Sequence, residues 1–216
     1  MVSLSPYIVV LPLLGFCVNG LLGKKFGERF SGIIGSGVVG MSFAIAALIL
    51  LEMLRAPADE RSHTIFIFNW ITAGALSVPL AYQVDQLSIL MVLIITGVGF
   101  LIHVYSIGYM HGDPAFWRFF AYLNLFIFMM LNLVMANNFL LMFLGWEGVG
   151  LCSYLLIGFW HDRTFETGGY KPGTATTSDA AKKAFIVNRI GDFGFLIAMF
   201  LIFNLVGSLT FDDVFS

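Results

Sequence analysis

One carboxylate lies in the middle of a long apolar stretch, FLGWEGVGLCSYLL, which covers residues 143–156. An ionised group surrounded by hydrocarbon is costly, so an intramembrane acid is by default a candidate functional residue. Glu147 lies about ten residues into the apolar segment and therefore near the middle of a bilayer. Its neighbours are small enough for close helix approach or for internal water: Gly145, Gly148, Gly150 and Ser153. The pattern favours proton handling over a carboxyl group that merely bonds a neighbouring helix.

A second group of polar residues interrupts the apolar stretch near the C-terminus, in the sequence VNRIGDFG (residues 187–194). Arg189 and Asp192 are three residues apart, which allows an ion pair on one face of a helix. Lys182 lies seven residues before Arg189 and shares that face. Lys182 and Lys183 are ambiguous, because a lysine near the end of a span can extend its ammonium group to water. An ion path and a buried structural network remain equally open for the Arg189–Asp192 pair.

These residues need helices that cross a membrane to hold them. Hydrophobic residues make up 59% of the 216-residue chain and charged residues 11%, which excludes a soluble enzyme. A crossing helix needs about 20 apolar residues. Six stretches satisfy this requirement, and together they predict an all-α, polytopic membrane helix bundle that forms one transmembrane domain over residues 1–216: about 6–23, 32–54, 85–109, 116–135, 138–160 and 183–206.

The segments between the predicted spans indicate local structure and orientation. The sequence HTIFIFNWI, within residues 55–84, alternates loosely and predicts a short strand or β-hairpin outside the membrane. Asp85 precedes the third span and is expected to cap that helix. The connector 161–180 is expected to be an exposed loop. Most basic residues fall on one side if the N-terminus is outside, which is the orientation that the positive-inside rule predicts.

Other motifs carry little weight. Gly35, Gly37 and Gly40 match a dinucleotide-binding pattern, but they lie inside a hydrophobic span, where close helix packing explains them better. The histidines show no metal-ligand spacing, and for His103 a hydrogen-bonded packing role is favoured. The two cysteines lie in apolar runs and are interpreted as small buried hydrophobic residues. We expect no cofactor and no metal site on this chain.

Two longer motifs carry a family resemblance. The sequences LGWEGVGLCSYLLIGFW and AAKKAFIVNRIGDFGF, with VDQLSILM and IHVYSIGYMHGD before them, resemble the large antiporter-like subunit of proton-pumping NADH:quinone oxidoreductase, respiratory complex I. Glu147 matches the fifth-span glutamate of that family. Arg189 and Asp192 match its sixth-span polar motif, and Lys183 matches the basic residue ahead of it. The resemblance implies that these four residues carry proton translocation, and that the glutamate couples to a lysine on a seventh span beyond this chain.

The resemblance also implies a setting. Quinone reduction elsewhere in the complex would drive proton transport, with NAD, FMN, iron-sulfur clusters and quinone on other subunits. The expected partners are the neighbouring antiporter-like subunits and the lipid bilayer, with no nucleic acid. The expected location is the bacterial inner (plasma) membrane, or the mitochondrial inner membrane if the chain is organellar. Two alternatives stay open, namely a subunit of a multi-subunit cation/proton antiporter and a structural or assembly fragment that transports nothing.

Overall fold

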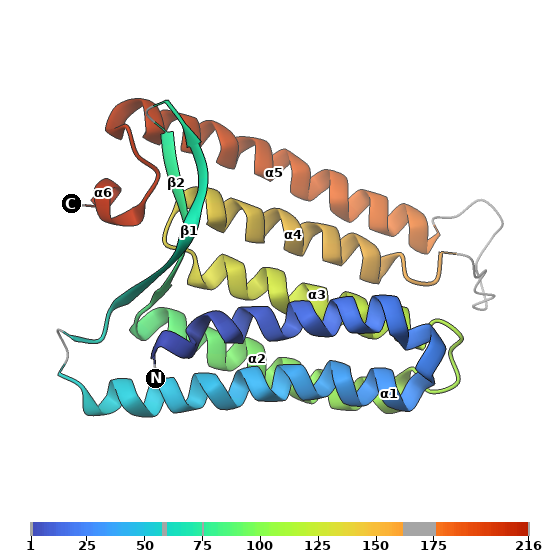
Figure 1. The fold of residues 1–216 in the computed structure, drawn as a ribbon. Coiled ribbons are helices and arrows are strands. Elements are labelled where there is room, and N and C mark those ends of the chain that lie inside the picture. The colour runs from blue at the N-terminus through green and yellow to red at the C-terminus, as the bar shows by residue number, and fades with distance from the viewer. Residues whose placement is uncertain (1, 58–59, 75, 162–175, 216) are drawn as a thin grey trace.

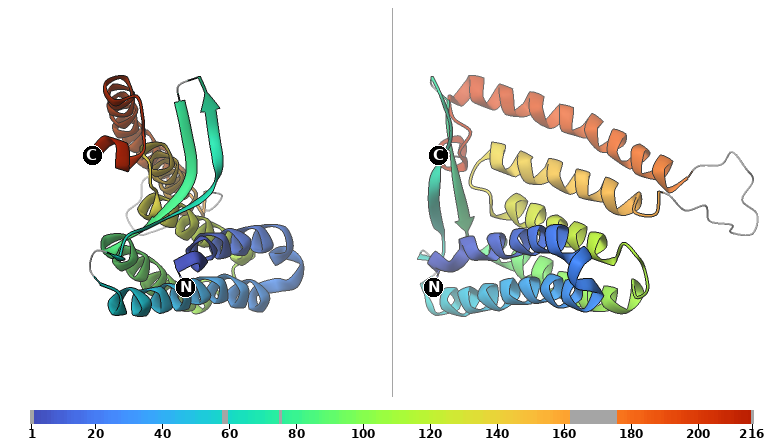
Figure 2. Two further views of the ribbon diagram at one scale, coloured as in Figure 1. Left: turned by 60° about the vertical axis from the view of Figure 1, so that its left-hand side comes forward. Right: turned by 45° about the vertical axis from the view of Figure 1, so that its right-hand side comes forward.

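The computed structural model describes residues 2–57, 60–74, 76–161 and 176–215. Most of them form helices that run along a common direction, and a two-stranded hairpin lies across one end of the bundle (Figure 1, Figure 2). The elements are η1 (Val2–Leu4), α1 (Ser5–Arg55), β1 (His63–Ala73), β2 (Leu76–Val84), α2 (Gln86–Tyr109), α3 (Phe116–Met135), α4 (Phe139–Ile157), α5 (Thr177–Val206) and α6 (Phe211–Phe215).

Helix α1 contains two of the segments that the sequence predicts as separate spans. Its backbone is interrupted at Gly27 (φ 85°, ψ −173°), a conformation that a residue with a Cβ rarely adopts. The chain reverses there, so the two halves lie side by side (Figure 1). The hydroxyl of Ser42 in the second half donates to the carbonyl of Ile8 in the first at 3.0 Å. Within the described residues, α1 to α5 are each long and apolar enough to cross a membrane.

The predicted hairpin is confirmed, and it is longer than the sequence indicated. β1 pairs antiparallel with β2 from His63↔Val84 to Ala73↔Leu76, with two register shifts. The hairpin, the N-terminus and the last described residues share one end of the bundle (Figure 1). Asp85 follows β2 and caps α2 as predicted, because its carboxylate accepts from Ser88 N at 2.7 Å while the Ser88 hydroxyl accepts from Asp85 N.

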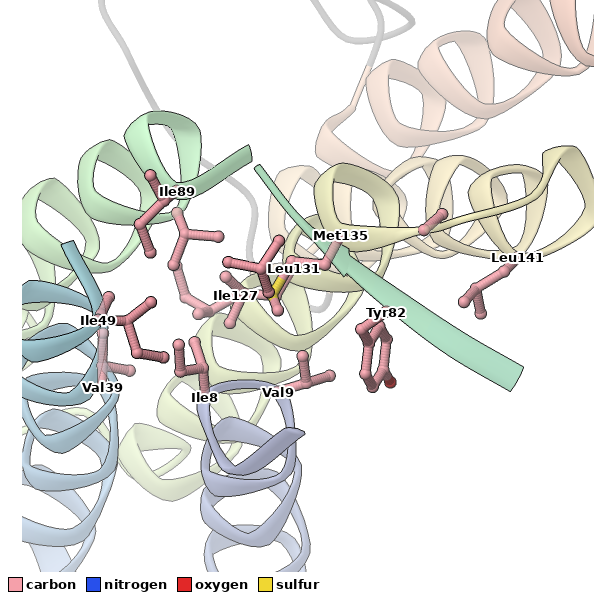
Figure 3. Packing of buried hydrophobic residues seen from close by; sticks show 14 of the residues in the cluster. Ile8, Val9, Val39, Ile49, Tyr82, Ile89, Ile127, Leu131, Met135 and Leu141 are labelled. Carbon is pink, nitrogen blue, oxygen red and sulfur yellow. The ribbon is translucent and has the colours of Figure 1, made fainter. Parts of the chain in front are cut away.

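The main hydrophobic core lies near this end, between α1, α2, α3 and β2 (Figure 3). Ile8, Ile49 and Leu131 are fully buried there. The hydroxyl of Tyr82, on β2, donates to Asn132 Oδ1 on α3 at 2.9 Å. Burying these side chains fixes the relative positions of α1 and α3, on which α4 then packs.

Helices α3 and α4 form the tight hairpin that the short connection 136–138 predicts. The side-chain oxygen of Asn138 accepts from Leu141 N at 2.8 Å and so caps α4. Two glycines on α4 allow close approach, because a Cβ on Gly145 would come within 2.5 Å of Leu133 N and one on Gly148 within 2.3 Å of Met129 Sδ. Their predicted role in close helix packing is confirmed.

Helix α5 begins earlier than the apolar pattern indicates. The sequence places the sixth span at about 183–206, whereas the helix starts at Thr177. Thr176 and Asp179 form a reciprocal capping box, with the Asp179 carboxylate accepting from Thr176 N at 2.9 Å. Local capping hydrogen bonds thus extend the helix through a polar turn that hydrophobicity alone excludes. α5 packs on α4, and most of its apolar side chains remain exposed.

Candidate functional site

The intramembrane acid of α4 has a partner on α5. Arg189 Nη1 lies 2.6 Å from Glu147 Oε1 and 2.5 Å from Oε2, so one guanidinium nitrogen contacts both carboxylate oxygens. The Glu147 side chain is 18% exposed and that of Arg189 is 50% exposed. Both residues lie near the middle of their helices. The contact joins residues 42 positions apart in the sequence, and it provides the pairing that an acid at this depth requires.

A second carboxylate adjoins this pair. Asp192 lies one turn after Arg189, and its Oδ2 is 3.9 Å from Arg189 Nε. The other oxygen of Asp192 accepts a hydrogen bond from Trp146 Nε1 at 2.8 Å. The Asp192 side chain is only 5% exposed. The predicted Arg189–Asp192 pair is therefore present but long, since the shorter contact of Arg189 is the one to Glu147.

Aromatic side chains complete the surroundings of the cluster. The guanidinium carbon of Arg189 lies 4.8 Å from the centre of the Phe185 ring, one turn earlier on α5. Trp146 also stacks on Phe195, with ring centres 6.2 Å apart. The sequence interpretation missed Trp146 and Phe185. An indole donor directly before the intramembrane glutamate was the available signal for Trp146.

The structure adds geometry to two expectations from the sequence. The resemblance implies a partner for Glu147 on a seventh helix, which lies outside this chain, and within the described residues Arg189 pairs with Glu147. Lys183 is exposed on α5 and makes no hydrogen bond or ion pair with the cluster. It lies six residues, or nearly two turns, before Arg189, so the structure brings together only three of the four predicted residues.

Other polar residues of the apolar helices have structural contacts. His103 Nδ1 lies 2.7 Å from the carbonyl oxygen of Gly99, which is the hydrogen-bonded packing role that the sequence favoured. A Cβ on Gly150 would lie 3.7 Å from Asn188 Nδ2, an ordinary contact distance, so α4 and α5 approach each other here with room for a methyl group. Across the described ranges, no three His, Cys, Asp or Glu side chains gather as metal ligands would.

Two family models match the chain. One, described as NADH-ubiquinone oxidoreductase (complex I), chain 5 N-terminus, matches residues 70–120. The other, described as NADH:quinone oxidoreductase/Mrp antiporter, TM, matches residues 136–216. The second match includes Glu147, Arg189 and Asp192, so the whole cluster lies in the part of the chain that this model describes.

Individual relatives cover nearly the whole chain. NADH-quinone oxidoreductase subunit L of Mycobacterium tuberculosis is 46% identical over 209 residues, which are 97% of this chain and 31% of the relative. The subunit L of Escherichia coli is 40% identical over 206 residues, 95% of this chain and 32% of the relative. NADH-ubiquinone oxidoreductase chain 5 of Metridium senile is 40% identical over 212 residues, which are 97% of this chain and 33% of the relative. The chain thus spans about a third of the length of these curated relatives.

Solved structures show the same fold at lower sequence identity. A chain of the membrane-bound sulfane sulfur reductase, an archaeal respiratory membrane complex, superposes with a TM-score of 0.79 at 16% identity, over 98% of this chain and 39% of that one. A chain of the Mrp complex from Dietzia sp. superposes with a TM-score of 0.73 at 20% identity. The superposition covers 97% of this chain and 20% of that one. The fold and the cluster between two of its helices define an antiporter-like, multi-pass membrane protein.

Within that class the sequence matches decide the family. The chain belongs to the subunit L/chain 5 family of NADH-quinone oxidoreductases and corresponds to the N-terminal part of its members.

Proposed function

We propose that this chain forms part of a proton-translocating membrane subunit of NADH:quinone oxidoreductase, in which Glu147 and Asp192 hold and pass protons and Arg189 sets which of the two carboxylates is ionised. The observation that carries the proposal is the contact of both Glu147 oxygens with Arg189 at membrane depth. Membrane proteins use such intramembrane ionisable groups in proton relays. The similarity to subunit L and chain 5 over nearly the whole chain supports the same assignment.

The charges of the cluster suggest how it would work. Two carboxylates and one guanidinium sum to one negative charge when all three are ionised, which is costly at low dielectric. One added proton makes the cluster neutral. Because Arg189 contacts Glu147 directly and lies 3.9 Å from Asp192, a small movement of its side chain would exchange its carboxylate partner. The carboxylate that Arg189 leaves then becomes the better proton acceptor.

The assembled complex would supply everything else. NAD, FMN, iron-sulfur clusters and quinone belong on other subunits in this proposal, and electron transfer there would drive the movement of Arg189. The neighbours in the membrane would be further antiporter-like subunits. The membrane would be the bacterial plasma membrane, or the mitochondrial inner membrane for an organellar chain. Lys183 has a smaller role in this scheme, as a basic residue toward the entrance of the path.

Glu147→Gln tests the proposal in the full-length subunit, assembled in its complex and reconstituted in vesicles. Proton uptake driven by NADH should fall strongly, while NADH oxidation by a water-soluble acceptor that bypasses the membrane part should not change. Lys25→Gln removes one charge from an exposed residue at the turn of α1 and serves as the matched control. Full proton pumping in Glu147→Gln complexes would refute the assignment.

A second candidate is a subunit of a cation/proton antiporter, which is favoured by the description of the model that matches residues 136–216 and by the fold of the Mrp chain. Vesicles that exchange Na⁺ for protons without NADH would support it over redox-driven pumping. The remaining alternative is a fragment that transports nothing. Glu147-dependent proton flux through the isolated chain in liposomes would exclude that alternative.

A further inference from the structure

A second polar site lies at the opposite end of the bundle from the hairpin. Here the start of α3, the end of α4 and the start of α5 meet (Figure 1). They enclose a cavity of about 250 Å³, smaller than the pockets that hold drug-sized ligands. Its polar lining comes from Arg118, Tyr122, Tyr154, His161 and Ser178. No acidic residue of the described part of the chain lines it.

The guanidinium of Arg118 is held in this cavity by one hydrogen bond and one aromatic contact, and one of its N–H donors is left without an acceptor among the described residues. Its Nη2 donates to the carbonyl of Phe159 at 3.1 Å, and its guanidinium carbon lies 4.8 Å from the centre of the Phe159 ring. Its Nε is buried and has no partner among the described residues. A buried donor of a charged group without an acceptor is costly. An anion in the cavity would supply that acceptor and balance the charge.

The acids nearest in sequence to the lining residues are engaged elsewhere. Asp113 Oδ2 accepts from Trp160 Nε1 at 3.0 Å. The Asp179 carboxylate accepts from the backbone and the hydroxyl of Thr176 in the cap of α5, both at 2.9 Å. Neither residue lines the cavity, so no acid of the described residues is placed there to balance the charge of Arg118.

The position of the cavity matches the headgroup level of a membrane. Tyr105, Tyr109 and Trp160 form an aromatic row at this end, with ring centres 5.9 Å and 6.4 Å apart, as expected of an interfacial belt. The α1 turn with its lysines is at the same end (Figure 1). This is the end that the charge distribution predicts to face the cytoplasm, where anionic lipids bind basic pockets between helices.

We propose that this cavity binds the phosphate group of an anionic phospholipid. Arg118 would hold the phosphate with its free Nε–H, and the hydroxyls of Tyr122, Tyr154 and Ser178 would donate to the remaining oxygens. A lipid is favoured over free phosphate because Leu155 and Phe159 also line the cavity and would contact the start of the acyl chains. The proposal is independent of the Glu147–Arg189 cluster.

Native mass spectrometry of the full-length subunit in its complex tests this site. Delipidated protein is titrated with phosphatidylglycerol, with zwitterionic phosphatidylcholine and with inorganic phosphate. Wild-type protein should retain one more phosphatidylglycerol than Arg118→Gln, whose occupancy should fall about fivefold for the loss of one cationic contact. Lys25→Gln makes the same charge change at the same end but outside the cavity, and it should retain the wild-type number.

Two further variants keep the test decisive if Arg118→Gln fails to assemble. Arg118→Lys keeps the charge but not the Nε–H, and Tyr122→Phe removes only one hydroxyl, so both should weaken phosphatidylglycerol binding without loss of fold. Equal retention of phosphatidylglycerol by wild-type and variant proteins would overturn the proposal. So would equal binding of both lipids, or displacement of the lipid by millimolar phosphate, which would indicate a site for a free anion.

Discussion

The contact between Glu147 and Arg189 makes the sharpest quantitative prediction. Two unit charges about 4 Å apart interact by about 4 kcal/mol at an effective dielectric constant of about 20. Asp192 lies 3.9 Å from the same guanidinium and remains as its partner when Glu147 is removed, so the measured coupling is smaller than this value. We therefore expect a coupling free energy of about 1–3 kcal/mol, within the range measured for contacting residues.

A double-mutant cycle measures this coupling. The variants are Glu147→Gln, Arg189→Gln and the double variant, with the free energy of unfolding measured by denaturant titration of the full-length subunit. Arg189→Gln leaves the carboxylates of Glu147 and Asp192 without their cation, whereas the double variant leaves only the carboxylate of Asp192, so the double variant should be less destabilised than the sum of the two single variants. Removing one partner of a well-buried pair costs about 3–5 kcal/mol, and because Asp192 remains beside Arg189 the expected loss for Glu147→Gln lies below that range.

Lys183→Gln provides the control cycle. Lys183 lies on the same helix and makes no contact with the cluster, so its coupling to Glu147 should be below about 0.5 kcal/mol, the usual additivity limit for separated sites. If the Arg189 cycle gives a value as small as the Lys183 cycle, the ion pair does not form in the membrane and our reasoning about the cluster is wrong.

Three further predictions concern the scaffold. In a denaturant titration, Gly145→Ala should lower the free energy of unfolding by about 1–2 kcal/mol, because the new methyl group meets the Leu133 backbone at 2.5 Å. Gly150→Ala is the control: its methyl group would meet a single atom at 3.7 Å, so it should be neutral or stabilising in the same titration. Asp85→Ala should cost about 1 kcal/mol through the lost cap of α2, and Asp85→Asn should restore most of it. Burial raises the pKa of Tyr82 to about 12 from an ordinary value of about 10. Its contribution to stability is thus intact below about pH 10 and lost as the pH rises toward 12, and Tyr82→Phe should remove the corresponding step from a tyrosinate absorbance titration.

The sequence predicts those features that depend on neighbouring residues. Asp85 was predicted as a cap because its role needs only the next turn of the chain, and Ser88 is three residues away. The short connection 136–138 likewise predicts an antiparallel pair of helices. The sixth span was predicted from residue 183, where the apolar stretch begins, whereas the helix starts six residues earlier because the capping box at Thr176 sets its start. The capping residues Thr176 and Asp179 mark the helix start in the sequence, but the prediction followed the apolar stretch instead.

The pairing of Glu147 could not be predicted in the same way. Arg189 shares a helix face with Asp192 and was paired with it by spacing alone, yet its shorter contact is to a residue 42 positions earlier. That choice depends on α5 packing against α4, where Gly150 and Asn188 lie opposite each other. A period of 3.6 residues gives the face of a helix and says nothing about which helix lies opposite.

The exposed edge of Arg189 shows what the cluster still requires. Half of this side chain is exposed at membrane depth, among Ile186, Ile190 and Phe193. A guanidinium beside hydrocarbon needs further polar contact, and Glu147 and Asp192 occupy only one side of it. The chain spans about a third of the length of its curated relatives, so in proteins of that length other helices are available to cover α5. A helix packed there would bring a polar or ionisable group to the open side of Arg189, and that group would then compete with Glu147 for the guanidinium.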